Sequence, residues 1–188
     1  MKILVTGGLG HIGSSIIRYL PKIKKIQTIY VLDNMMSQRY SSLFNLPKNT
    51  KYKFLNLDLS MCNISEIPKS DIVIHLAAKT DAAQSSKFKN EFYKNNKKAT
   101  LNIIKYCNKN NSKLIFASST SVYGPQTKIV FENSSFKNLN PQTPYAKIKL
   151  DEEKLIQKNL KKINSYLILR LGTIYGFSPG IRFHTAIN

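Results

Sequence analysis

Met1-Lys-Ile-Leu-Val-Thr-Gly-Gly-Leu-Gly-His-Ile-Gly13 is the stretch of sequence that decides the fold. An apolar run at residues 3–5 is followed by glycines at 7, 10 and 13, and residues 12–20 continue as an amphipathic segment. This order predicts a buried strand, a tight glycine turn and the start of a helix. Glycine permits a sharp turn, close approach of the backbone to phosphates and close packing of helix on sheet, while the helix N-terminus offers N–H groups to an anion. The stretch therefore predicts a cradle for a dinucleotide pyrophosphate.

An acidic residue further along the chain supports this interpretation. The spacing Gly-x-x-Gly-x-x-Gly is less specific than Gly-x-Gly-x-x-Gly, but Asp33 lies twenty residues after Gly13, at the end of an apolar run over residues 28–32. A carboxylate there accepts hydrogen bonds from the adenosine ribose and repels a 2′-phosphate, which favours NAD over NADP. The alternative is that Asp33 only starts a turn with Asn34.

Composition and length predict one globular domain. The chain has 188 residues, 42% of them hydrophobic, and its apolar runs are too short to span a bilayer. Without a visible signal peptide, we expect a cytoplasmic protein with no membrane contact. Cys62 and Cys107 are isolated, and the three histidines follow no metal-ligand spacing, so we expect reduced thiols and no metal site.

The net charge of +19 is unusual. It comes from 25 lysines and 4 arginines scattered along the chain, in a sequence also rich in Asn and Ile. A biased codon usage with solvated lysines explains this better than a nucleic-acid surface, since no aromatic side chains alternate with arginines. Nucleic acid is therefore not expected as a partner, although a positive field would help to attract a diphosphate substrate.

Short apolar runs alternate with longer helical patterns throughout. The predicted fold is α/β: a doubly wound, Rossmann-type parallel sheet with helices on both faces and strand order 3-2-1-4-5-6. Residues 34–50 are expected to form a loop with at most a short helix. Residues 1–171 form the predicted NAD-binding domain, and residues 172–188 begin a substrate-binding region that is expected to be truncated. Strands are predicted at 2–6, 28–32, 51–56, 71–77, 113–118 and 165–171, and helices at 12–20, 92–108 and 144–160.

The pair Tyr145 and Lys149 carries the predicted chemistry. Four residues apart at the start of a helix, they share one helical face, where an ammonium favours the phenolate form of the tyrosine. Such a tyrosine can take a proton from a sugar hydroxyl while hydride leaves the carbon. Chance alone can produce this spacing in a lysine-rich helix. The hydroxyls after residues 113–118, at the carboxyl end of a strand, would face the same crevice and support the functional interpretation.

Together these motifs resemble the extended short-chain dehydrogenase/reductase family, in its branch of NAD-dependent epimerases and dehydratases, and most of all the nucleotide-sugar 4-epimerases. The matching pieces occur in order across the chain: Thr6-Gly-Gly-Leu-Gly-His-Ile-Gly13, Asp33-Asn34, Asp58-Leu59, His75-Leu-Ala-Ala78, Asn96 with Ala99-Thr100, Ser118-Ser-Thr-Ser-Val-Tyr-Gly124, Pro144-Tyr-Ala-Lys-Ile-Lys149 and Leu169-Arg-Leu-Gly-Thr-Ile-Tyr-Gly176.

The resemblance implies a role for each matching residue. Tyr145 would be the catalytic base and acid, Ser119 the catalytic hydroxyl, and Lys149 would bind the nicotinamide ribose. Ser119, Thr120 and Asn188 would contact a nucleotide-diphosphate sugar. The resemblance also implies a homodimer through the helices at 92–108 and 144–160. The residues implied to bind NAD are Gly7, Gly10, His11, Ile12, Gly13, Asp33, Asn34, Asp58, Leu59, Leu76, Ala77, Ala78, Asn96, Tyr145 and Lys149.

Departures from the family pattern narrow the expected function. Ala99 replaces a usual glycine, and Thr120-Ser121 stands where dehydratases of the family carry an Asp-Glu pair. We therefore expect reversible hydride transfer in a sugar epimerisation rather than dehydration. Most of the family's substrate lobe has no counterpart here. Two alternatives remain: a truncated or split NAD-binding domain with little activity of its own, and a non-catalytic relative that senses NAD or binds nucleic acid.

Overall fold

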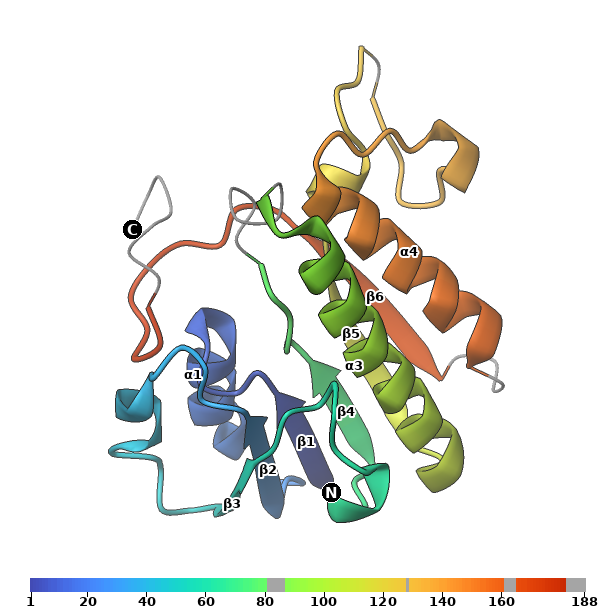
Figure 1. The fold of residues 1–188 in the computed structure, drawn as a ribbon. Coiled ribbons are helices and arrows are strands. Elements are labelled where there is room, and N and C mark those ends of the chain that lie inside the picture. The colour runs from blue at the N-terminus through green and yellow to red at the C-terminus, as the bar shows by residue number, and fades with distance from the viewer. Residues whose placement is uncertain (81–86, 128, 161–164, 182–188) are drawn as a thin grey trace.

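A single parallel sheet organises the chain in the computed structural model, which describes residues 1–80, 87–127, 129–160 and 165–181. All five strand pairings are parallel and the order is β3-β2-β1-β4-β5-β6. This confirms the predicted fold and strand order (Figure 1). The strands are β1 (Lys2–Thr6), β2 (Thr28–Asp33), β3 (Lys51–Asn56), β4 (Ile72–His75), β5 (Lys113–Ser119) and β6 (Tyr166–Leu171).

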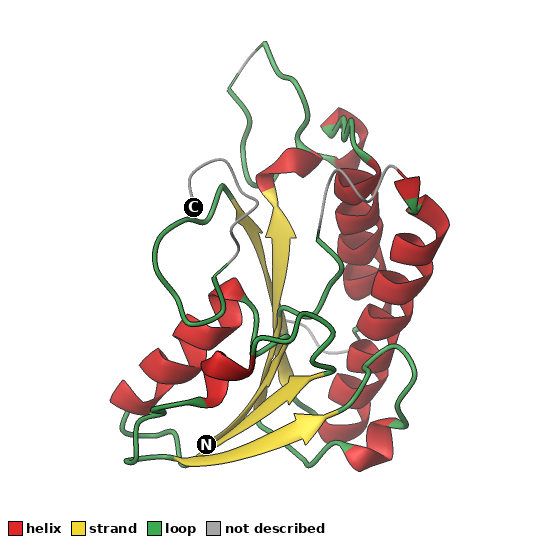
Figure 2. Ribbon diagram, turned by 60° about the vertical axis from the view of Figure 1, so that its left-hand side comes forward, coloured by secondary structure: helices red, strands yellow, loops and turns green. Residues whose placement is uncertain are grey.

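Apolar side chains pack on both faces of the sheet because successive residues of a strand point to opposite sides. In β1, Ile3 and Val5 pack into the cluster that contains Ile17 of α1, whereas Leu4 packs with Ile103 on the opposite face. Figure 2 shows α1 on one face and the two long helices on the other. The long helices α3 and α4 pack against each other. The helices are α1 (His11–Tyr19), α3 (Lys89–Asn110) and α4 (Pro144–Asn159).

Local sequence explains where the helices begin and end. The Oγ1 atom of Thr143 accepts a hydrogen bond from the backbone N–H of Ala146 (3.1 Å), and Pro144 occupies the first turn of α4, where its missing N–H costs nothing. Asn111 ends α3 in the left-handed conformation, with φ 57°. Short 3-10 helices complete the described structure: η1 (Leu20–Lys22), η2 (Tyr40–Leu43), η3 (Ile64–Glu66), η4 (Thr120–Val122) and η5 (Phe136–Asn138).

The predicted boundaries hold for β1 and β3 but are wrong for β4. That strand ends at His75 rather than at residue 77, because the chain leaves the sheet there. Leu76 and Ala77 are therefore free to line a cleft. The predicted loop over residues 34–50 contains one short helix, Tyr40–Leu43, as expected.

Residues 172–181, the crossing segment, run from β6 back towards α1 along the carboxyl edge of the sheet (Figure 1). Two hydrogen bonds attach its far end: the backbone N–H of Gly180 donates to Ser14 Oγ (3.0 Å), and Ser41 Oγ donates to the carbonyl of Pro179 (3.0 Å). The segment thus spans the edge at which ligands bind in open parallel sheets. None of the described helices combines the length and the apolar character that crossing a membrane requires.

Candidate functional site: a cleft at the carboxyl edge of the sheet

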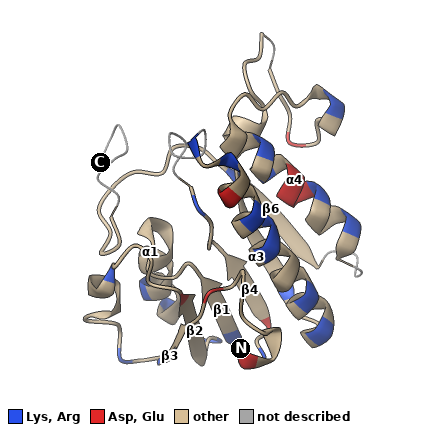
Figure 3. Cartoon of the chain, viewed as in Figure 1, with Lys and Arg blue, Asp and Glu red and all other residues tan. Residues whose placement is uncertain are grey.

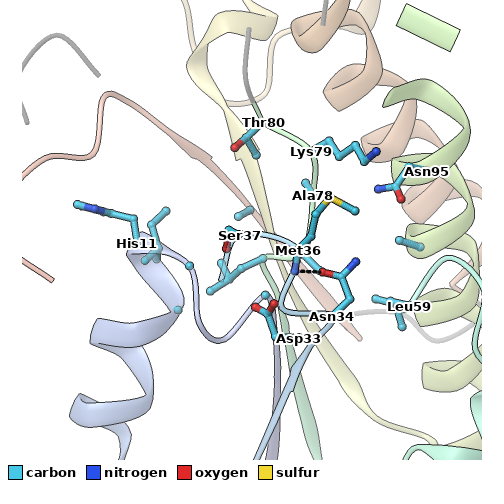
Figure 4. Close-up of a pocket in the computed structure, with 18 of the residues that line it drawn as sticks. His11, Asp33, Asn34, Met36, Ser37, Leu59, Ala78, Lys79, Thr80 and Asn95 are labelled. Carbon is cyan, nitrogen blue, oxygen red and sulfur yellow. Dashed lines mark hydrogen bonds between the residues drawn. The ribbon is translucent and has the colours of Figure 1, made fainter. Parts of the chain in front are cut away.

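A cleft of about 940 Å³ lies outside the carboxyl ends of the strands. Figure 4 shows His11 on one side, Lys79 and Asn95 on the other, and Asp33 and Asn34 between them. The loops after β1, β2, β3 and β4 contribute to its lining, as do the end of β5 and the start of α4. Sequence positions far apart in the chain therefore meet at the crevice where a doubly wound sheet binds its ligand.

The glycine turn between β1 and α1 is closely packed. Gly7 has φ +66°, and a Cβ there would lie 2.7 Å from the backbone N of Ala77. At Gly13 a Cβ would lie 2.3 Å from the carbonyl oxygen of Gly7. Gly10 is the N-cap of α1, and none of the described side chains caps that helix end. The turn therefore presents closely packed backbone and a helix N-terminus to the cleft, which suits an anion such as a pyrophosphate.

Asp33, the last residue of β2, is hydrogen-bonded to the glycine turn after β1. Its Oδ2 accepts a hydrogen bond from the backbone N–H of Leu9 (3.1 Å), and its Oδ1 accepts one from Met35 N–H (2.9 Å). These contacts hold the half-buried carboxylate at the floor of the cleft beside the glycine turn. Each carboxylate oxygen has a second lone pair, so both can also accept hydrogen bonds from ribose hydroxyls.

Asp58, after β3, is held by its neighbours. Ser60 donates to its Oδ1 from the backbone N–H (2.8 Å) and from the hydroxyl (2.7 Å), and Asn34 Nδ2 donates to Oδ2 (3.1 Å). Burial disfavours the charged form, but the hydrogen bonds from Ser60 and Asn34 outweigh it and lower the pKa of Asp58. The next residue, Leu59, offers an apolar surface to the same end of the cleft.

The loop after β4 lines the cleft with the small side chains of Ala77 and Ala78. Behind it lies Asn96 of α3, which is fully buried. Its Oδ1 accepts from Lys79 N–H (2.9 Å), and its Nδ2 donates to the Lys79 carbonyl (3.0 Å). Asn96 is the one described residue of the predicted cofactor set that does not line the cleft; it holds the loop that does. The Lys79 ammonium forms an ion pair with Glu91.

Ser119, Tyr145 and Lys149 line the same cleft as the glycine turn. Ser119 ends β5, and its Oγ accepts hydrogen bonds from Ser121 N–H (3.2 Å) and Ser121 Oγ (2.8 Å), so its own hydroxyl hydrogen can be donated. Tyr145 is half-buried at the start of α4. Lys149 is only 4% exposed, and its Nζ lies 4.6 Å from the ring centre of Phe116.

A second hollow of about 430 Å³ adjoins the cleft at Ser119, Gly172 and Thr173. Thr120, predicted to contact substrate, lines this hollow rather than the main cleft. The other lining residues supply hydroxyl, amide and backbone groups: Ser121, Gly124, Pro125, Gln142 and Thr143. Asn188, the third predicted substrate residue, lies outside the described residues.

Buried charges that the sequence interpretation missed hold α4 against the sheet. Glu153 binds Arg170 of β6 through Oε1 to Nε (3.1 Å) and Oε2 to Nη2 (2.8 Å), and it also accepts a hydrogen bond from Ser118. The hydrogen bonds that Arg170 donates to Glu153 raise the pKa of its guanidinium, although partial burial acts in the opposite direction. The sequence did contain a signal for Glu153, because this residue lies one helical turn after Lys149 on the face of α4 that packs on the sheet.

Several other lining residues were also missed. Met36, Ser37 and Arg39 directly follow Asp33-Asn34, and Thr80 follows Lys79, so extending those motifs would have found them. Glu91 and Asn95 carry no such signal, since their place in the cleft depends on how α3 packs. Within the described ranges, no three His, Cys, Asp or Glu side chains gather as a metal site.

Comparison with known sequences agrees with this geometry. Residues 3–187 match the sequence model described as the NAD dependent epimerase/dehydratase family. The chain is 36% identical over 191 residues to dTDP-D-glucose 4,6-dehydratase of Dictyostelium discoideum, an alignment that covers 93% of this chain and 44% of that protein.

Solved structures show the same likeness. The UDP-Glc/GlcNAc 4-epimerase of Campylobacter jejuni is 32% identical with a TM-score of 0.78, covering 90% of this chain and 52% of that one. A UDP-glucuronic acid 4-epimerase of Bacillus cereus, solved with NAD bound, is 28% identical with a TM-score of 0.79, covering 90% and 56%. This chain thus spans about half the length of these relatives. It belongs to the NAD-dependent epimerase/dehydratase family, whose cofactor is NAD.

Proposed function

We propose that this chain carries the cofactor-binding and proton-transfer half of a nucleotide-sugar epimerase. The observation that carries the proposal is that Ser119, Tyr145 and Lys149 line one cleft together with the glycine turn and Asp33. A proton-transfer group and a dinucleotide cradle in the same cleft are what hydride transfer from a sugar carbon requires.

The residues present fit NAD. The backbone at Gly7 and Gly13 leaves no room for a Cβ, which supports a cradle for the pyrophosphate. Of the residues that line the cleft, Asp33 would bind the adenosine ribose hydroxyls, Asp58 and Leu59 would flank the adenine, and Tyr145 and Lys149 would bind the nicotinamide ribose. When bound, NAD would accept a hydride from the sugar carbon and return it.

The chain's own residues would move the proton. Tyr145 would take the proton of a sugar hydroxyl as the carbon-bound hydride leaves, and would return it in the reverse step. The Lys149 ammonium would lie one helical turn further along the same face of α4 and would bind the nicotinamide ribose. Ser119 would donate a hydrogen bond to the sugar oxygen as it becomes a carbonyl. A keto sugar that turned over before the hydride returned would be inverted at that carbon.

The substrate we propose is a nucleotide-diphosphate sugar, because the solved relatives named above act on UDP-linked sugars. The hydroxyl-rich hollow beside Ser119, with Thr120, supports a sugar ring near the proton-transfer group. Dehydration is the second candidate, since the relative from Dictyostelium is a 4,6-dehydratase. Thr120-Ser121 offers no acid and base pair for removing water, which favours epimerisation.

The relatives are about twice as long as this chain, so residues 1–171 would supply the NAD domain and residues 172–188 the start of the substrate-binding part. A homodimer and a cytoplasmic location also belong to the proposal. Burial raises the pKa of Cys62 and raises that of Cys107 to about 12, and such unreactive free thiols fit a reducing compartment.

The test replaces Tyr145 with phenylalanine. The chain is incubated with NAD and a UDP-hexose, and NMR follows formation of the 4-epimer or of a deoxy-keto product. We expect Tyr145→Phe to lower turnover by about three orders of magnitude, while the loss of one hydrogen bond to the ribose weakens NAD affinity by no more than about tenfold. Tyr19→Phe, at the exposed end of α1, serves as the matched control. NAD binding without any turnover would favour an NAD-binding domain with little activity, and retained turnover in Tyr145→Phe would overturn the assignment of the base.

A further inference from the structure

A buried acidic residue, Glu152, contacts Lys149 on α4. Lys149 Nζ lies 3.1 Å from Glu152 Oε2, and the two residues are 4% and 1% exposed. Among the described residues Oε2 accepts no hydrogen bond, and its partner is the Lys149 ammonium, as an ion pair. A carboxylate this deeply buried is costly unless it is paired, and Lys149 is the positive charge it meets.

The other oxygen of Glu152 ends a chain of hydrogen bonds through the core. Thr100 donates its hydroxyl to Glu152 Oε1, and His75 Nε2 lies 3.3 Å from Thr100 Oγ1. His75 Nδ1 lies 2.7 Å from Thr6 Oγ1, which also accepts the backbone N–H of Ala77 (3.3 Å). Glu152 thus links Lys149 to the loop after β4 that lines the cleft.

The directions of these bonds follow from the acceptor at one end. Because Glu152 can only accept, Thr100 donates to it and receives the Nε2–H of His75. His75 Nδ1 then accepts the Thr6 hydroxyl, whose oxygen receives Ala77 N–H. The arrangement uses each hydrogen once and requires an uncharged His75. In agreement, burial, followed by the charge of Lys149, lowers the pKa of His75 to about 3.

We propose that Glu152 is a positioning residue for Lys149, holding its ammonium against Phe116 at the wall of the cleft. This inference rests on the proposed role of Lys149 at the nicotinamide ribose. One side of the ammonium faces Glu152, which leaves further N–H donors for ribose hydroxyls. Without Glu152, a buried ammonium beside an aromatic ring loses its counter-charge and sheds its proton more easily.

The surroundings contain few other charges that could replace Glu152. Tyr145 lies one turn earlier on α4, and His75 approaches from β4 in its uncharged form. Glu153 is engaged by Arg170 and Ser118. Glu153 is also 1% exposed and sits next to Glu152 on the same helix, so it offers a matched control.

The first arm of the test measures pairing through stability, without cofactor. Glu152→Leu should lower the melting temperature by roughly 10 °C, because it leaves a buried ammonium unpaired. The double variant K149M/E152L should recover most of that loss, since both charges are gone. If the losses in melting temperature caused by the two single substitutions simply add in the double variant, the ion pair does not contribute to stability and the proposal is wrong.

The second arm measures NADH affinity by fluorescence at pH 6.5 and pH 9. For E152Q the dissociation constant for NADH should rise about tenfold from pH 6.5 to pH 9, because the unpaired Lys149 loses its charge-assisted hydrogen bonds to the cofactor. The unaltered chain and E153Q should change by less than about twofold. An NADH dissociation constant of E152Q that does not change with pH would show that Glu152 has only a structural role. It would overturn the positioning role while leaving the proposed function intact. Failure of the unaltered chain to bind NADH would overturn the proposed function together with it.

Discussion

His75 is the residue whose chemical state most depends on the fold. It lies at the end of β4, 2% exposed, between Thr6 and Thr100. The hydroxyls of these two threonines are hydrogen-bond partners of its ring nitrogens, and the charge of the Lys149 ammonium disfavours a charged ring. Its neutral form therefore belongs to the native structure, and unfolding returns it to an ordinary histidine.

Acid should destabilise the protein through His75. Its pKa is about 3 in the native state against an ordinary value of 6.5, so below pH 6.5 the unfolded chain binds a proton that the native chain does not. The stabilisation is complete above pH 6.5 and is lost as pH falls towards 3. Between pH 7 and pH 5 the loss from this residue is about 2 kcal/mol. Urea unfolding at pH 7 and pH 5 measures this loss in the free energy of unfolding, which we expect for the unaltered chain and not for His75→Gln. An equal loss in both proteins would contradict the expectation.

At the scale of elements, the crossing segment bridges the two sides of the cleft. Its first residues, Gly172, Thr173 and Ile174, line the cleft, and its far end is seated on the glycine turn. A Cβ at Gly180 would lie 2.2 Å from the carbonyl oxygen of Leu9 and 2.6 Å from that of Gly10. Only glycine fits at this position, so the packing of the crossing segment on the glycine turn depends on Gly180.

Gly180→Ala should unseat the crossing segment and open the cleft. We expect NADH to dissociate about tenfold faster, equivalent to about 1.4 kcal/mol, because the far end no longer packs on the turn. Ser41→Ala, which removes only the hydrogen bond to Pro179, should have a smaller effect in the same direction. Stopped-flow displacement of bound NADH measures both rates. An unchanged rate in Gly180→Ala would show that the segment does not limit release.

Charge dominates the molecule as a whole. Figure 3 shows Lys and Arg along α3 and at intervals along α4. The exposed lysines of these helices are Lys89, Lys94, Lys98, Lys105, Lys109, Lys147, Lys154 and Lys158. A homodimer through α3 and α4, which remains a prediction, would bring two such surfaces together.

Dimerisation through these helices should therefore strengthen with salt. The screening length falls from about 10 Å at 0.1 M to about 3 Å at 1 M, which weakens repulsion between the lysines. Sedimentation velocity should show a larger dimer fraction at the higher salt, and Lys105→Glu should raise the dimer fraction at 0.1 M by replacing a repulsive contact with an attractive one. A dimer fraction that falls with salt would point to a different surface.

Local pattern predicted much of this protein. The glycines at 7, 10 and 13, Asp33, and the pair Tyr145 and Lys149 could be found because each motif depends on spacing along the chain. The strand order followed as well, since alternating strands and helices leave few parallel topologies. Of the described residues predicted to contact NAD, all but Asn96 line the cleft.

Contacts between distant segments were decided only by the tertiary structure. The links from Glu152 through Thr100 and His75 to Thr6 join four elements, and no spacing in the sequence encodes them. Asn96 holds a loop seventeen residues away rather than lining the cleft, and Gly180 meets Leu9 from the opposite end of the chain. The physical reason is the same in each case. Sequence periodicity reports which face of an element is buried, whereas the partner of a buried polar group depends on how those faces pack together.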